Sequence, residues 1–365
     1  MTAALRWWCV GVGVLLLVAT PMFVRALPVS DEDVSAGALL QRIEGSRDLA
    51  FSGYTESAGN VGLPGNDDLE SLTDLLSETH RARVWWRDPQ VWRVATVRTT
   101  GETDLAHEPG QMTRWVFESR TVTVVPDVPV RLPNTADLLP NELARRVLAG
   151  ARPGELSRLP AARVAGRDAL GLRLTPADEQ ASIGHVDVYA DRRSGLPLRV
   201  QLYGRGSATP VLTSRFLDVS LARPSAHDVA FRAPARAQIR YDGVLDLAAA
   251  ANRFAARVPP ETLAGLPARG SLQGSVGVYG RGPTVLLAVP LWSRSADRVR
   301  DELRGQPGVR DLDQGVLVAA PPLRMLLARP EHNDGSWLLA GTVTRRAILD
   351  AAEQLERDPP GLRFP

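Results

Sequence analysis

The stretch "VDVYADRRSGLPLRVQLYG", residues 186–204, places two alternating apolar segments on either side of a charged turn. Alternation with a period of two is the pattern of a half-buried β-strand. The turn, Asp191–Gly195, ends in a glycine, which can adopt the positive φ that tight hairpins require. Its two arginines would also suit a phosphate or carboxylate site, but the spacing of a P-loop is absent. We therefore predict a β-hairpin with a solvated turn.

Further strands are predicted upstream, in "VWWRDPQVWRVATVR" (84–98) and around "RWVFES" (114–119). Trp92 and Val94 would lie on one face of their strand. Val91 and Ala95 would lie on the other, whereas a sheet with one face in water alternates apolar and polar residues more cleanly. Both faces of this sheet are therefore expected to be covered, one by a helix and the other by packed core or by a ligand cavity.

The order of the predicted elements indicates an antiparallel sheet that curves around helices. Residues 34–46 and 135–151 carry apolar residues at helical spacing. Strands are predicted in residues 161–176, in the hairpin and in residues 211–224. Strands and helices do not alternate regularly, as the units of a parallel sheet would. An α+β fold is the expected class.

The pattern of "VAGRDALGLRL", the hairpin, "SRFLDVSLARP" and the closing "FRAP" resembles the later strands of the LolA-like superfamily, which includes the RseB or MucB type of exported regulatory protein. "VWWRDPQVWRV" is similar to the strand after that superfamily's first helix. The resemblance covers about residues 34–234 and includes no catalytic signature. It implies a half-barrel, an unclosed antiparallel β-barrel with inserted helices, whose apolar cavity receives acyl chains or other hydrophobic ligands.

Five residues are the candidates for lining such a cavity. Trp92 with Val94, and Trp115 with Phe117, would each begin an alternating strand face that is unusually apolar for a surface in water. The alternative is that aromatic strand residues simply form core. The candidates are Trp85, Trp92, Val94, Trp115 and Phe117.

Composition narrows the function classes. With 365 residues and 44% hydrophobic content, the chain can bury the cores of two domains. All 43 basic residues are arginine, as in a GC-rich bacterial genome, and they are scattered among 41 acids, so no stripe for nucleic acid is present. The one cysteine, Cys9, supports neither an internal disulfide nor a thiolate metal site. Without a metal-ligand spacing of histidines, a P-loop or a GxSxG motif, we expect no metal, no cofactor and no enzymatic activity.

The N-terminus carries an uncharged apolar run from Trp7 to Val24, between Arg6 and Arg25. Eighteen residues are just enough to cross a hydrocarbon core of about 30 Å. Arginine before the run and the acidic "SDED" after it favour a cytoplasmic N-terminus and an extracytoplasmic body. A cleaved signal peptide is the alternative, because Val24 and Ala26 are small enough for a signal peptidase. We expect a retained signal anchor in residues 1–26, and single-pass attachment to the cell membrane.

The remaining chain divides into a half-barrel domain, residues 27–240, and a small α+β domain, residues 241–365. In the second, residues 248–258 are alanine-rich and helix-prone, and strands are predicted on either side of Gly280–Pro283. Residues 293–305 and 344–357 have helical patterns, with serine and threonine as N-caps. RseB-like proteins also carry a smaller second domain at this position.

The sequence thus predicts a membrane-anchored extracytoplasmic binding protein of the cell envelope. Its hydrophobic cavity would hold an acylated lipid or lipoprotein, and it would act as a carrier or envelope sensor. The alternative is an RseB-like regulator that acts through protein contacts on a membrane-bound anti-sigma factor or transporter complex. Acyl chains and a membrane protein are the expected partners, and nucleic acid is not.

Overall fold

The computed structural model describes residues 29, 31–62, 70–98, 101–127, 133–241, 259–269, 276–305, 308–329 and 336–357. Two sequence predictions, the anchor in residues 1–26 and the alanine-rich helix in residues 248–258, lie outside these ranges. Within them, no helix is long and apolar enough to cross a bilayer.

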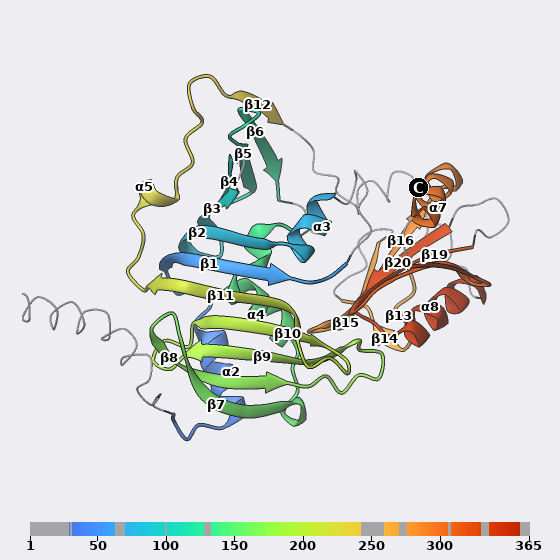
Figure 1. The fold of residues 1–365 in the computed structure, drawn as a ribbon, viewed down its shortest axis with the longest axis horizontal. Coiled ribbons are helices and arrows are strands. Elements are labelled where there is room, and N and C mark those ends of the chain that lie inside the picture. Colours follow the sequence, from blue (N-terminus) through green and yellow to red (C-terminus); the bar gives the residue numbers. More distant parts are fainter. Residues whose placement is uncertain are drawn as a thin grey trace, which may run out of the picture.

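A twelve-stranded sheet forms the larger part of the molecule (Figure 1). Its order is β12-β6-β5-β4-β3-β2-β1-β11-β10-β9-β8-β7, so β12 and β7 are free edges and the sheet does not close. Neighbouring strands are antiparallel, except that β12 runs parallel to β6. The strands are β1 (Phe51–Gly59), β2 (Thr79–Asp88), β3 (Val91–Arg98), β4 (Gly101–Glu108), β5 (Gln111–Val116), β6 (Thr121–Pro126), β7 (Leu156–Val164), β8 (Arg167–Leu174), β9 (Ile183–Asp191), β10 (Pro197–Gly204), β11 (Pro210–Ser220) and β12 (Gln238–Tyr241).

Short helices cover this sheet. α2 and α4 pack on the face formed by β8–β11, where Leu39 and Ile43 of α2 meet Leu143 and Val147 of α4 in one apolar cluster. This is the unclosed, helix-covered sheet that the sequence predicts. The helices are α2 (Ala36–Gly45), α3 (Glu70–Ser77), η1 (Thr135–Leu138), α4 (Pro140–Leu148), η2 (Pro153–Glu155) and α5 (Ala226–Val229).

The hairpin forms as predicted, with β9 and β10 in antiparallel register and Gly195 at φ +76°. Its turn is less solvated than expected, because a Cβ at Gly195 would lie 2.3 Å from the carbonyl oxygen of Arg42 in α2. Asp191 accepts hydrogen bonds from the backbone of Arg193 and Ser194 and is 3% exposed. The turn therefore seats α2 against the sheet, while Arg193 stays exposed.

A second sheet of six strands, in the order β15-β16-β20-β19-β18-β17, builds the smaller domain. One apolar cluster joins one face of it to α8, and another joins the opposite face to α7. Thr344 caps α8 as predicted, but Trp292, and not a serine, is the N-cap of α7. The elements are β13 (Thr262–Leu263), β14 (Leu266–Pro267), β15 (Gly277–Arg281), β16 (Thr284–Leu291), α7 (Ser293–Arg304), β17 (Val309–Leu312), β18 (Gly315–Ala320), β19 (Leu323–Ala328), β20 (Ser336–Gly341) and α8 (Arg345–Arg357).

Arg281 of β15 joins the two domains. Its guanidinium lies 2.5 Å from Glu155, at the end of η2, and 3.1 Å from Asp178. The Glu155 side chain is 3% exposed and also accepts hydrogen bonds from the backbone of Arg152 and Ala177. A buried carboxylate is stable only when its oxygens are satisfied in this way. Backbone contacts extend the junction, since Ala181 and Val343 form a β-bridge.

Acid is expected to weaken this junction through Glu155. Hydrogen bonding from Arg281 is the main cause that lowers the pKa of this carboxyl from 4.5 to about 2. The stabilisation is therefore complete above pH 4.5 and is lost as the pH falls towards 2, about 3 kcal/mol in all. Urea unfolding measured from pH 2 to pH 7 checks this.

The Glu155→Gln variant is expected to lose that pH dependence and to be less stable than the parent at pH 7. Asp350→Asn is the matched control, because the ion pair of Asp350 with Arg346 is long, at 3.7 Å, and exposed. If Glu155→Gln loses stability below pH 4.5 as the parent does, another group is the cause of that loss.

Candidate functional site

A row of aromatic rings crosses the inner face of the sheet, the face that α2 and α4 cover. Phe51, Trp86, Trp92 and His107 occupy directly opposed positions on β1 to β4. The rings of Phe51 and Trp86 stack at 5.8 Å, those of Trp86 and Trp92 at 5.7 Å, and those of Trp92 and His107 at 5.4 Å. Cross-strand pairs of this kind fix strand register and add stability.

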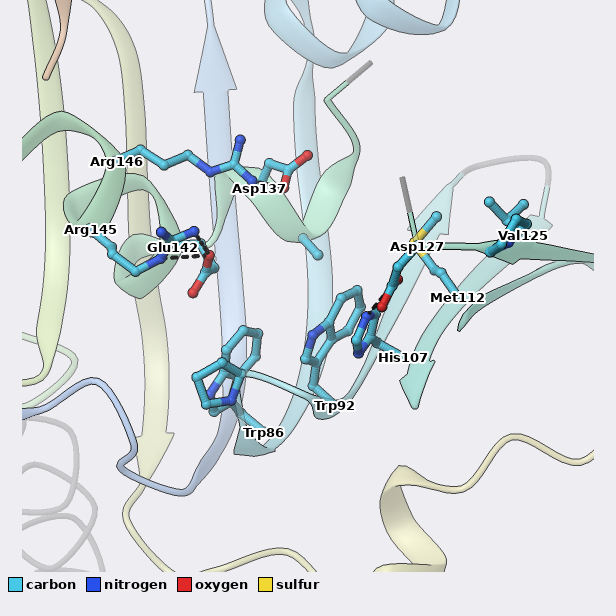
Figure 2. Close-up of a pocket in the computed structure, with 13 residues that line it drawn as sticks. Trp86, Trp92, His107, Met112, Val125, Asp127, Asp137, Glu142, Arg145 and Arg146 are labelled. Atoms are coloured by element: carbon cyan, nitrogen blue, oxygen red, sulfur yellow. Dashed lines mark hydrogen bonds and ion pairs between the residues drawn. The ribbon is translucent and has the colours of Figure 1, made fainter. Parts of the chain in front are cut away.

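A hollow of about 190 Å³ lies at the open end of this row. Figure 2 shows Trp86 and Trp92 on one side of it and Glu142, Arg145 and Arg146 of α4 on the other. The arginines in it are paired, Arg145 with Glu142 at 2.7 Å and Arg146 with Asp137. The His107 ring lies in hydrogen-bonding contact with Asp127 at 3.0 Å. The hollow is therefore small, and both of its arginines are already paired.

A larger groove of about 360 Å³ lies between α2 and α4. Its volume falls in the range of small-molecule pockets, about 300 to 1,000 Å³. Apolar side chains and the two cations Arg47 and Arg145 both line it. The lining residues are Ile43, Glu44, Ser46, Arg47, Asn141, Glu142, Arg145, Leu148, Ala149 and Pro197.

The two helices create the groove because each turns one face to the sheet. Pro140 opens α4 at a position where no backbone donor is needed, and Leu143 and Val147 then point into the core. Asn141 and Arg145 are left on the groove side. The side-chain oxygen of Asn141 is buried without a hydrogen-bond partner, so it can accept one from a bound group.

Only part of the predicted set of cavity residues shares one face. Trp92 and Val94 do lie on the inner face, where they are 5% and 0% exposed and belong to one apolar cluster. Of the two, Trp92 also borders the hollow of about 190 Å³. Trp85 lies on the outer face, because it neighbours the inward Trp86, and Arg93 packs over its ring at 5.4 Å.

Trp115 also lies on the outer face, opposite Asp104, with its ring 6.4 Å from that of Phe231. Phe117 follows the end of β5 and is 63% exposed. The structure therefore does not bring the five residues together around a single cavity. The sequence analysis did not identify the groove residues Arg47, Asn141 and Ala149. Only the packing of two predicted helices on one sheet brings these residues together, and no local pattern marks it.

No group of three or more His, Cys, Asp or Glu residues suited to a metal ion occurs in the described ranges. The four histidines whose contacts are described, His80, His107, His185 and His227, lie on separate elements. His185 stacks on Tyr203 at 4.2 Å, and burial lowers its pKa. These residues form structural contacts and converge on no common centre.

The chain matches no protein-family model and no curated protein. Solved structures are similar to it at low identity. The Pseudomonas aeruginosa MucA/MucB complex has 18% identity and a TM-score of 0.49, over 87% of this chain and 96% of that one. MucB in a separate crystal structure has 16% identity and a TM-score of 0.45, over 87% and 96%. A LolA superfamily protein from Nitrosomonas europaea has 12% and 0.23, over 54% and 98%. At these values the similarity does not show what this chain binds.

Replacing Trp92 by alanine is expected to destabilise the larger domain by about 3 to 5 kcal/mol, because a stacked, buried ring is lost. Trp292→Ala is the matched control: that ring is 55% exposed, and a change within about 0.5 kcal/mol is expected. Urea unfolding of the two variants measures both values. A Trp92→Ala protein as stable as the parent would show that this ring contributes little to the packing of the domain.

Proposed function

We propose that the chain is a membrane-anchored extracytoplasmic binding protein, with no catalytic role, that holds an acyl chain of a lipid or lipoprotein in the groove between α2 and α4. The observation that supports this is the groove itself, with Leu148, Ala149 and Pro197 along it and Arg47 and Arg145 at its sides. Anchoring by residues 1–26 is part of the proposal and rests on the sequence. Such a protein would serve as a carrier or as an envelope sensor.

The chemistry of the groove fits an amphiphile. Each buried methylene contributes about 0.8 kcal/mol, less the cost of ordering the chain. Arg47 has no ion-pair partner among the described residues, so it can pair with a phosphate or carboxylate head group. Asn141 offers an acceptor for a donor on the same ligand. The apolar floor and the single uncompensated cation thus suit a single-chain anionic lipid or one acyl chain of a larger one.

Filling the groove is the direct test. Ala149 is exposed in the extended residue that ends α4, so Ala149→Trp adds a ring to the groove without altering the core. A dansyl-labelled fatty acid is expected to bind the variant at least tenfold more weakly than the parent, by fluorescence titration. Ala319→Trp, at an exposed position of β18, is the control and should bind normally. Equal affinity in all three proteins would exclude the groove.

A second candidate function is regulation through protein contacts, which is the alternative that the sequence analysis kept open. It is favoured by an apolar surface on the smaller domain, where the partly buried Leu287, Leu291 and Leu338 pack on one cluster and the exposed Trp292 follows Leu291 in the chain. Trp292 is 55% exposed, which is unusual for so large a ring. This surface would receive a segment of a membrane protein.

Native mass spectrometry of the full chain, extracted gently from membranes, separates the two candidates. Copurified lipid that is lost in Ala149→Trp supports the binding protein. A stoichiometric protein partner that is retained in Ala149→Trp but lost in Trp292→Glu supports the regulator. Neither lipid nor protein in the parent sample would count against both.

A further inference from the structure

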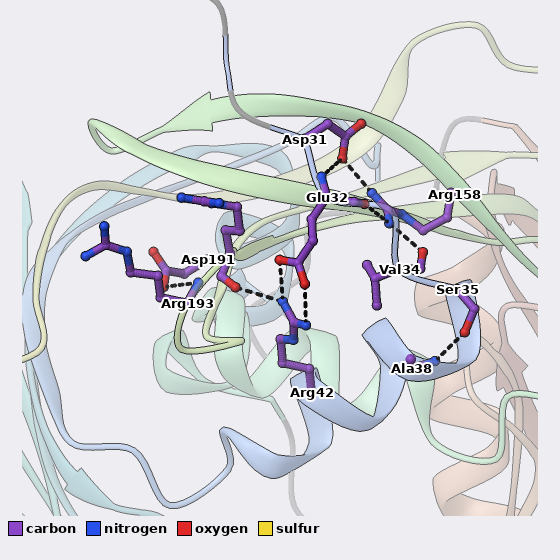
Figure 3. A network of polar contacts seen from close by, with 10 residues as sticks. Asp31, Glu32, Val34, Ser35, Ala38, Arg42, Arg158, Asp191 and Arg193 are labelled. Carbon is purple, nitrogen blue, oxygen red and sulfur yellow. Dashed lines mark hydrogen bonds and ion pairs between the residues drawn. The ribbon is translucent and has the colours of Figure 1, made fainter.

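The chain is fixed to the half-barrel directly after the predicted anchor. Arg158 of β7 donates to the carbonyl oxygens of Glu32 and Val34 at 3.2 and 2.7 Å, and to the carboxylate of Asp31 at 2.9 Å. Arg42 of α2 holds the Glu32 carboxylate with two hydrogen bonds, at 2.8 and 3.0 Å. Figure 3 shows these two arginines on either side of residues 31–34. We call this arrangement the clasp.

The clasp also includes the turn of the β9–β10 hairpin. Arg42 donates a further hydrogen bond, at 2.9 Å, to the carbonyl oxygen of Arg192. The entry point of the chain is thereby tied to one end of the sheet, the end where β9 stops and β10 begins. Pro197, the first residue of β10, lines the α2–α4 groove, so the groove lies at this end too.

The reach of the connecting chain is short. Six residue steps separate Arg25, the charged residue after the apolar run, from Asp31. Fully extended, they span about 20 Å. The smaller domain bonds to the far end of β9, at Ser182 and Ala181, and nine residues of β9 extend over about 30 Å. With the proposed anchor in residues 1–26, a tether of this length is shorter than β9, so the bilayer would lie closer to one end of β9 than to the other.

The end of β9 at the β9–β10 turn, which we call the near end, also differs from the far end in charge. Three arginines there are paired: Arg42 with Glu32, Arg163 with Asp168, and Arg167 with Asp191. Arg192 and Arg193 form no ion pair among the described residues, although Arg192 acts electrostatically on Glu32. The exposed Asp33 of the clasp segment has no ion pair there either, so these three residues leave one positive charge in excess. Cations near an anionic leaflet are attracted over about one Debye length, roughly 8 Å at physiological ionic strength.

We infer that the clasp orients the half-barrel, with the β9–β10 turn facing an anionic bilayer and the smaller domain directed away from it. The groove between α2 and α4 then opens beside the membrane, where lipid is at hand. This inference rests on the anchored state in the proposed function and adds the orientation to it. The matching surface is the lipid headgroup layer of the membrane that holds the anchor.

The test uses the full chain in lipid nanodiscs made of phosphatidylglycerol and phosphatidylcholine, with an energy acceptor on the head groups. In a Cys9→Ser background, a donor dye is attached at Arg193→Cys or at Arg346→Cys. The two sites are matched, because each is an exposed arginine beside another arginine, and Arg346 lies on α8 of the smaller domain. Energy transfer is expected to be at least twofold more efficient from position 193.

Opening the clasp should remove this difference. Arg158→Ala deletes its three hydrogen bonds to residues 31–34 and a fourth, to the carbonyl oxygen of Gly171. Glu32→Gln, a milder change at a half-exposed side chain, only weakens the pair with Arg42. In both variants the transfer from position 193 is expected to fall towards that from position 346, while thermal unfolding stays cooperative. Equal transfer from the two sites in the parent, or a difference that survives both variants, would overturn the inference. So would release of the chain from the nanodiscs.

Titration of the same samples with the dansyl-labelled fatty acid keeps this test apart from that of the proposed function. Asymmetric energy transfer without fatty-acid binding supports the orientation and rejects the groove as the ligand site. Fatty-acid binding with equal energy transfer from both positions rejects the orientation and retains the groove as the ligand site.

Discussion

The inner face of the larger sheet is filled by the chain's own side chains, and the rest of the structure follows from this packing. The aromatic row on β1 to β4 covers one part, and α2 and α4 cover the other. Protein interiors pack as densely as organic crystals, so little space is left between these layers. The larger groove instead lies between α2 and α4, and residues of these two helices that point away from the core line it.

The sequence predicts the elements of this fold better than it predicts their mutual positions. Alternation in residues 186–204 and helical spacing in residues 34–46 are local signals, and both elements form as predicted. Trp85 and Trp92 belong to adjacent strands, and only the register of β2 against β3 places them on opposite faces. The groove depends on two helices about a hundred residues apart, so no local pattern could predict it.

Arginine pairs convert scattered charges into specific contacts. Asp187 and Asp191 are 5% and 3% exposed, and an arginine reaches each of them at 2.7 and 2.6 Å. Arg173 binds both carboxylate oxygens of Asp187, a two-pronged geometry that the planar guanidinium permits and a lysine ammonium does not. Such pairs tie neighbouring strands together on the outer face, where an apolar core is lacking. Charge that looks unpatterned in the sequence therefore has a structural role.

Helix α4 contacts both the groove and the smaller domain. Its outward face lines the groove through Asn141 and Arg145. Its C-terminal end abuts the smaller domain, because a Cβ at Gly282 would lie 2.8 Å from the carbonyl oxygen of Val147, and Arg281 donates to the carbonyl of Gly150 at 3.1 Å. The core beneath α4 is closely packed, so the helix is held between that core and the smaller domain. A ligand in the proposed groove would therefore contact the same helix that the smaller domain contacts.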